Sequence, residues 1–320
     1  MLNCKVQLCT ALLVILTACK KQEFYPAVNV DVGNASQQSQ LVTPTTFGLA
    51  EENTTDSETK KDMSTADVNI LRLGIYLSET TINRTADSYL AQGYQVQFIV
   101  CWDDTINGNR SFPKDTNAIK VKANAFFKYY ANRKKQIPFI AVENEWDLQV
   151  QNGANLQDYI RELSIITAIG HKYGFYIADG GITSAALQRW TYSQLPAAAQ
   201  VQWKLNYYVG LNNDYDGLLN IVNTYLASVQ KVNFDYSNVH WYNSIICGNG
   251  FATSSKAFMK SGNKKVLVCN EFGIRTNSLT LFTQTDNEIN GNALYAIAYS
   301  GSNVPGKAIK LTDGMLKAMN

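Results

Sequence analysis

The sequence is short of the residues that several common kinds of site require. Histidine occurs only at His171 and His240, and no pair among the six cysteines has the spacing of zinc ligands. A zinc site is therefore not expected. No glycine-rich phosphate loop follows an apolar run, which argues against nucleotide binding, and no Gly-x-Ser-x-Gly motif supports a serine hydrolase. We expect neither a metal ion nor an organic cofactor.

The chain also carries little net charge. Its formal charge of +2 at pH 7 gives no reason to expect nucleic acid or another highly charged partner. Apolar residues make up 46% of the chain and charged residues 17%, which provides for a large core and argues against global disorder. The 320 residues suffice for one large domain or two small ones. We expect a folded monomer that binds no nucleic acid.

The first residues have the pattern of an export signal. The segment 6–17 is largely apolar but shorter than the ~20 residues that a membrane span needs. It leads into Leu-Thr-Ala-Cys at 16–19, which resembles the bacterial lipobox. The resemblance implies a signal peptide over 1–19, a lipid on Cys19 and a lipid-anchored protein of the bacterial cell envelope, at the outer membrane and facing either side. The alternative is a plain signal peptide with an incidental cysteine.

Three cysteines would remain after the signal is removed. Cys101, Cys247 and Cys269 are odd in number, so they cannot all pair within the chain. Cys101 and Cys269 lie at or beside apolar runs, and buried free thiols are expected for both. The alternative is a single disulfide between two of the three, because export would permit it.

Residues 20–45 read as a flexible tether, since they are polar and lack periodicity. Beyond them, over 46–320, strand-like runs alternate with amphipathic helical patterns, which predicts βα units around a parallel sheet. Eight such runs match a (β/α)8 TIM barrel of ~250 residues; a doubly wound open sheet is the alternative. The runs lie at 45–50, 68–77, 96–102, 138–145, 175–179, 238–242, 265–271 and 293–299.

Helices are predicted between these runs, with two weak points. The segment 51–63 is polar and a poor helix former, and 182–235 is too long for one connection, so we expect extra helices and part of the cleft there. The helical patterns lie at 117–133, 155–173, 217–232 and about 305–319.

Two glutamates at the ends of apolar runs are the main candidates for chemistry. Glu145 ends the fourth run and Glu271 ends the seventh. An unpaired buried carboxylate is very unfavourable, but the carboxyl ends of barrel strands carry active sites. Two carboxylates there suit general acid/base and nucleophilic work on a glycosidic bond. Glu143 competes with Glu145, because in a regular strand both would point the same way; the adjacent Asn144 favours Glu145.

These residues resemble a known group of enzymes. Asn144-Glu145, the triplet at 240–242 (His-Trp-Tyr) and Glu271, in this order at strand ends, are similar to the clan A (4/7) glycoside hydrolases. The resemblance implies Glu145 as acid/base and Glu271 as nucleophile. It further implies Asn144 as donor to the sugar 2-hydroxyl, His240 as a cleft residue, Tyr242 as the residue that orients Glu271, and Arg72 as a partner of Glu271. Arg72 would lower the pKa of Glu271.

Aromatic residues near these strand ends are candidate sugar contacts. Trp102 ends the third run, with a surface turn as the alternative, and Trp146 follows Glu145. The clan commonly has a tryptophan at the eighth strand, but the run 293–301 has none. Tyr299 is the candidate substitute, and a tryptophan from elsewhere in the chain is the alternative.

The sequence thus predicts a retaining glycoside hydrolase that acts on a β-linked oligo- or polysaccharide. The alternative is a non-catalytic, surface glycan-binding lipoprotein on a degenerate (β/α)8 barrel, favoured by the missing tryptophan. Geometry distinguishes them: carboxyl groups ~5–5.5 Å apart at an open cleft indicate the retaining enzyme.

Overall fold

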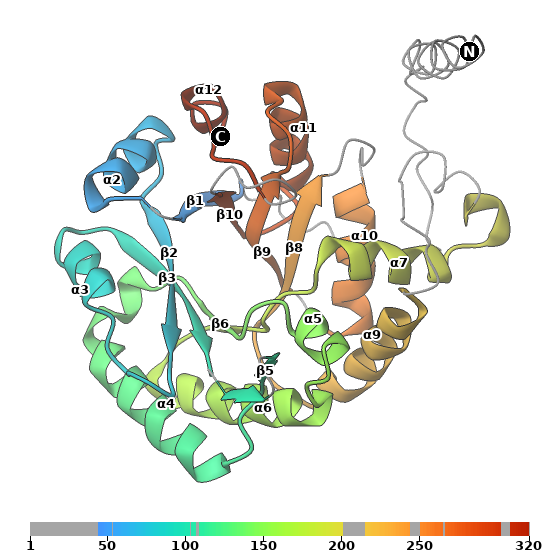
Figure 1. The fold of residues 1–320 in the computed structure, drawn as a ribbon, viewed down its shortest axis with the longest axis horizontal. Helices are drawn as coiled ribbons and strands as arrows, with labels where there is room; N and C mark the ends of the chain where they lie inside the picture. The colour runs from blue at the N-terminus through green and yellow to red at the C-terminus, as the bar shows by residue number, and fades with distance from the viewer. Residues whose placement is uncertain are drawn as a thin grey trace, which may run out of the picture. The chain divides into compact units, whose positions relative to one another are not determined.

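The computed structural model shows a closed barrel of eight parallel strands with helices around it (Figure 1). It describes residues 44–319 except 53, 103, 107–108, 201–214, 244–249, 265 and 302–307. The signal, Cys19, nearly all of the tether and Cys247 lie outside the described residues. The predicted (β/α)8 fold is confirmed, and the open sheet is excluded. Around the barrel the strands are β1 (Thr46–Glu51), β10 (Tyr295–Ser300), β9 (Val266–Ile274), β8 (Tyr236–Asn243), β7 (Ile177–Ala178), β6 (Ile140–Val142), β3 (Gln95–Cys101) and β2 (Ile70–Tyr76).

Each of the eight predicted runs overlaps one barrel strand. The largest difference is in the strand predicted over 138–145: β6 covers only Ile140–Val142, because the backbone turns left-handed at Glu143. A short antiparallel hairpin of β4 (Asp104–Ile106) and β5 (Asn109–Ser111) follows β3 and was not predicted.

The first and the last helix along the chain depart from prediction. The segment 51–63 was expected to be poorly helical, yet α2 begins at Asp56, where Thr55 and Glu58 form a capping box. The predicted final helix over 305–319 is wrong for 308–312: Ile309 pairs its backbone with Ile274 and Gly301 instead. The helices are α2 (Asp56–Thr65), α3 (Arg84–Ala91), α4 (Thr116–Tyr130), η1 (Ala131–Gln136), α5 (Trp146–Gln151), α6 (Leu156–Tyr173), α7 (Ser184–Gln194), α9 (Tyr215–Val229), α10 (Gly250–Ser261), α11 (Leu279–Ile289) and α12 (Asp313–Leu316).

Alternation along the strands divides the core into two layers. On β3, for example, Val96, Phe98 and Val100 pack in the large outer cluster with the helices, whereas Ile99 and Cys101 lie in a separate interior cluster. Cys101 and Cys269 are both buried and neither is in a disulfide bond, as expected. Within the described part of the chain, no helix combines the length and the hydropathy of a membrane span.

Candidate active site

A bulge in β9 brings two polar side chains to the barrel interior. Asn238 of β8 pairs with Val268 of β9, and the next pair is His240 with Glu271. Between the two pairs β9 therefore has one residue more than β8. The pairing of β9 with β10, its neighbour on the other side, has the same one-residue irregularity. A bulge of this kind re-aims side chains, and here Asn270 and Glu271, although consecutive, both contact interior residues of β8.

Glu271 is held by two donors. Arg72, on β2, lies 2.5 Å from its Oε2, and the Tyr242 hydroxyl donates to its Oε1 at 2.5 Å. Burial alone would raise the pKa of this carboxyl, but the charges of Arg72 and His240 and the bond from Tyr242 lower it to about 2. Glu271 is therefore an oriented carboxylate at neutral pH.

Arg72 links the ends of the two strands after which the candidate glutamates lie. Its Nη2 donates to Asn144 Oδ1 at 2.7 Å, while its Nη1 bonds Glu271. The Asn144 side chain is thereby fixed beside both carboxylates. With its oxygen occupied, Asn144 keeps its amide N–H groups for a ligand.

Glu143 and Glu145 go to different places because the backbone is left-handed at both, with φ of 68° and 51°. Glu143 is fully buried, and its oxygens accept from the backbone N–H of Trp102 at 2.6 Å and from Gln149 at 3.2 Å. The Glu145 side chain is 25% exposed and meets His240. The expectation that the two would point the same way was wrong, because the strand ends before Glu143.

His240 connects the two candidate catalytic carboxylates. Its Nδ1 lies 3.2 Å from Glu145 Oε1 and 3.9 Å from Glu271 Oε1, and its side chain has no exposed surface. Burial lowers the pKa of His240, but the two carboxylates raise it by more. One donor atom from each of the three residues lies within 4.8 Å of the others. We assign no metal ion to this trio, because Arg72 and Tyr242 already occupy both oxygens of Glu271.

Two glycines after β7 allow this packing. A Cβ at Gly180 would lie 2.5 Å from the carbonyl oxygen of Val142. Gly181 has φ +78°, and a Cβ there would lie 2.5 Å from the His240 ring. The Gly-Gly pair after Asp179 is visible in the sequence. The structure explains it, because only residues without a Cβ fit so close to the Val142 backbone and the His240 ring.

No protein-family model and no curated protein sequence matches this chain. Solved structures match it in fold. A family 39 glycoside hydrolase from the gut symbiont Bacteroides cellulosilyticus WH2 aligns with a TM-score of 0.54 and 11% identity over 87% of this chain. A thermostable mutant of a xylanase from Cellvibrio japonicus aligns with a TM-score of 0.51 and 10% identity, over 87% of this chain and 98% of that one. The barrel is similar in fold to those of glycoside hydrolases. This chain covers 62% of the family 39 enzyme, and such low identities carry the fold alone.

The aromatic candidates fall into two groups. Trp146 is fully buried and stacks on Tyr225 with ring centroids 4.0 Å apart, so it belongs to the core and has no surface for a ligand. Trp102 is also buried, and its backbone N–H anchors Glu143. Tyr299 lies edge-on to Tyr242 at 6.5 Å and is only partly buried. Of the three, Tyr299 is thus placed beside the partner of Glu271.

Asp147 is a residue of this region that the sequence did not single out. It is fully buried beside Glu145, and both its oxygens accept bonds from Thr183, from the hydroxyl at 2.6 Å and the backbone N–H at 3.2 Å. Burial raises its pKa to about 6 despite those bonds. An Asp at the second position of a short helix gives no sequence signal of such burial.

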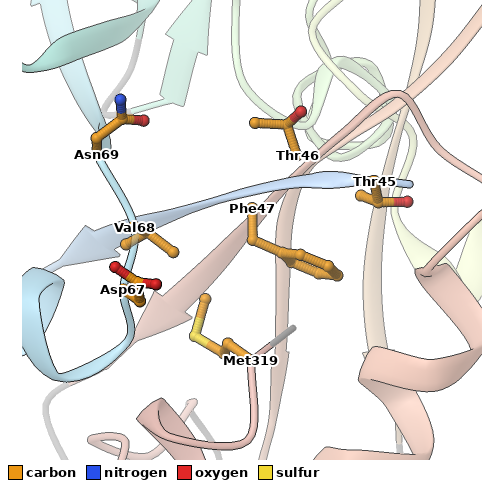
Figure 2. Close-up of a pocket in the computed structure, with 7 residues that line it drawn as sticks. All are labelled: Thr45, Thr46, Phe47, Asp67, Val68, Asn69 and Met319. Carbon is orange, nitrogen blue, oxygen red and sulfur yellow. The ribbon is translucent and has the colours of Figure 1, made fainter. Parts of the chain in front are cut away.

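A pocket of about 560 Å³ lies at the other end of the barrel (Figure 2). It is formed where β1 and β2 begin, whereas Glu145 and Glu271 lie where β6 and β9 end. Chemistry in this fold takes place at the carboxyl ends of the strands, so the pocket is not a candidate active site. Its lining residues are Thr45, Thr46, Phe47, Asp67, Val68, Asn69 and Met319.

Proposed function

We propose that this chain is a retaining glycoside hydrolase acting on a β-linked oligo- or polysaccharide. The observation that carries the proposal is the pair of carboxylates: oxygens of Glu145 and Glu271 lie within 4.8 Å of each other, and Glu271 alone is bound by Arg72 and Tyr242. Retaining enzymes place their carboxyl groups ~5–5.5 Å apart, whereas inverting enzymes need room for a water molecule between them. The pair here is close enough for direct attack.

In the first step, the Glu271 carboxylate attacks the anomeric carbon as the glycosidic C–O bond breaks. Glu145, as the acid, gives its proton to the leaving oxygen, which departs as an alcohol. The products are a glycosyl ester on Glu271 and a Glu145 carboxylate. In the second step, Glu145 takes a proton from a water molecule, and the oxygen of that water attacks the anomeric carbon. The bond between the anomeric carbon and Glu271 then breaks. Two inversions retain the configuration, and both carboxyl groups return to their starting state.

The neighbouring side chains suit a sugar beside Glu271. Asn144 can donate from its amide to the 2-hydroxyl, since Arg72 occupies its oxygen. Tyr299 offers a partly exposed ring next to Tyr242. The similarity in fold to a family 39 glycoside hydrolase and to a xylanase supports a glycan as the ligand.

A non-catalytic glycan-binding protein is the second candidate. The observation that favours it is the absence of a tryptophan from β10, where Tyr299 stands instead. The ordered contacts of Glu271 weigh against it, because a binding protein has no need of an ionised and oriented carboxylate.

Glu271→Gln tests the proposal. The variant keeps the shape of the side chain but removes the nucleophile, so hydrolysis of a panel of β-glycans should fall by at least ~10³-fold. The matched control is Glu79→Gln, which changes an exposed carboxylate after β2. Undiminished hydrolysis by Glu271→Gln would overturn the assignment, and binding without hydrolysis by the unaltered protein would favour the second candidate.

A further inference from the structure

Three buried polar residues form a hydrogen-bonded chain beneath His240. Asp179 follows β7, Asn238 lies on β8 and Asn270 lies in the β9 bulge, and all three side chains are inaccessible to solvent. Asp179 accepts the backbone N–H of Asn238 on Oδ1 at 2.7 Å and the hydroxyl of Tyr225 on Oδ2. The chain ends at His240 Nε2, which lies 2.8 Å from Asn270 Oδ1.

The contacts of Asn238 determine which way its amide faces. Its Oδ1 accepts the backbone N–H of Asn270 at 3.0 Å, and its Nδ2 lies 3.1 Å from the backbone carbonyl oxygen of Asp179. A backbone N–H can only donate and a carbonyl oxygen can only accept, so the reverse orientation would lose both bonds. The same Nδ2 donates to Asn270 at 2.7 Å, so the atom of Asn270 that receives this bond is its oxygen.

It follows that His240 must donate from Nε2. Asn270 Oδ1 is an acceptor, and an imidazole nitrogen that faces an acceptor carries the hydrogen. In neutral His240 the lone pair is then on Nδ1, which faces Glu145 Oε1 at 3.2 Å. Such a pair needs one further proton between them, held either by Glu145 as the acid or by His240 as imidazolium.

We propose that Asn238 and Asn270 are positioning residues that fix the proton of His240 on Nε2, so that His240 Nδ1 and Glu145 share a single proton. The significance for catalysis rests on the proposed function, whereas the tautomer does not. The charged or titratable groups that act on His240 are Glu145, Glu271, Arg72 and Asp147. The shared proton is the one that Glu145 would deliver to the leaving group.

The ¹⁵N chemical shifts of the imidazole nitrogens in the full chain test the tautomer without any substrate. The two histidines are His171 and His240, and His171→Gln, which removes the partner of Asp235 outside this site, identifies their signals. Across the pH range in which the protein stays folded, we expect Nε2 of His240 to be protonated, with Nδ1 either bare or protonated as well. A neutral His240 with its hydrogen on Nδ1 would overturn the proposal.

Two isosteric variants test the cause. Asn238→Asp replaces the Nδ2 donor by an oxygen, so Asn270 should turn its amide nitrogen toward both neighbours and move the hydrogen of His240 to Nδ1. Asn270→Asp keeps an acceptor in place and should keep Nε2 protonated. Asn270 Nδ2, which this variant replaces, has no hydrogen-bond partner among the described residues. If Asn238→Asp folds and leaves Nε2 protonated, the proposal fails; if it does not fold, the unaltered protein and Asn270→Asp decide.

Kinetics separate this role from a merely structural one. In Asn238→Asp, a hydrogen on Nδ1 would stabilise the Glu145 carboxylate and weaken the acid. We expect kcat/KM to fall ~10-fold or more on an unactivated glycan but to change less than ~2-fold on an aryl glycoside with a good leaving group, which needs no acid. Equal losses on both substrates would argue against the shared proton. Should no glycan be hydrolysed at all, the proposed function fails while the ¹⁵N result still stands or falls by itself.

Discussion

Glu143 and Glu145 share a left-handed backbone conformation, yet Glu143 is sealed in the core while Glu145 reaches His240 at the barrel mouth. Non-glycine residues in this conformation are uncommon, and each is unfavourable by ~1–2 kcal/mol. Backbone strain of this kind is characteristic of functional sites. Here the turn directs one carboxylate inward as an anchor and leaves the next free to act.

This difference predicts opposite phenotypes for two matched variants. Glu145→Gln should lower hydrolysis of unactivated glycans by ~10²–10⁴-fold with little change in Tm, because the proposed general acid is lost while the amide can still hydrogen-bond His240 Nδ1. Glu143→Gln should lower stability by ~1–3 kcal/mol, because its carboxylate accepts bonds from Trp102 and Gln149 and an amide replaces one acceptor with a donor. Thermal unfolding and initial rates on the same preparations measure both. Loss of activity at unchanged Tm in Glu143→Gln would exchange the two roles.

Arg72→Met should move the acidic limb of the pH–rate profile. Burial raises the pKa of Glu271, and Arg72 is the largest of the influences that lower it to about 2. As the proposed nucleophile, Glu271 must be ionised, so without Arg72 it would be active only at higher pH, and the acidic limb of kcat/KM should shift to higher pH. Arg84→Met, which alters a guanidinium whose side chain is 82% exposed, is the control and should leave the profile in place. An unmoved acidic limb in Arg72→Met would show that Arg72 does not govern the ionisation of Glu271.

Gly181→Ala should damage the site through its backbone. The residue has φ +78°, and the added Cβ would lie 2.5 Å from the His240 ring, so we expect a loss of at least ~1–2 kcal/mol in stability and a displaced ring. Gly74→Ala on β2 is the control, because a Cβ there meets no atom within 4 Å. Chemical denaturation measures the stability, and the His240 ¹⁵N signals report the ring. Equal behaviour of the two variants would contradict the packing described.

The N-terminal prediction is tested in a bacterial host. If Leu-Thr-Ala-Cys is a lipobox, a labelled fatty acid should be incorporated into the full chain, and Cys19→Ala should abolish the label and release the protein from the membrane fraction. Cys247→Ala is the matched control and should retain the label. A labelled Cys19→Ala variant, or an unlabelled full chain, would leave a plain signal peptide as the explanation.

The positions of most barrel strands could be predicted because burial on both faces makes these strands largely apolar. The strand ends were less predictable. The predicted fourth strand was extended past Val142 to Glu145, whereas the left-handed turn at Glu143 ends β6 where the apolar residues end. The short capping motif at Thr55 likewise outweighed the polar composition of α2.

Asn238 and Asn270, the residues that support His240, were not predicted, because the residue type of a polar side chain within a strand does not reveal its partner. Spacing offered one clue: Tyr236, Asn238, His240 and Tyr242 are two apart on β8, and such residues share a face. No spacing rule predicts that Asn270 shares a face with Glu271, since consecutive residues normally alternate. That placement requires the irregularity in β9.

The bulge also makes the site depend on chain length at one point. Removing one residue near Cys269 would restore strict alternation, and one of Asn270 and Glu271 would then turn toward the helices. All eight strands could still pair and the barrel could still close. For this chain we therefore expect that a single-codon deletion at the bulge would dismantle the site although no proposed catalytic residue is removed.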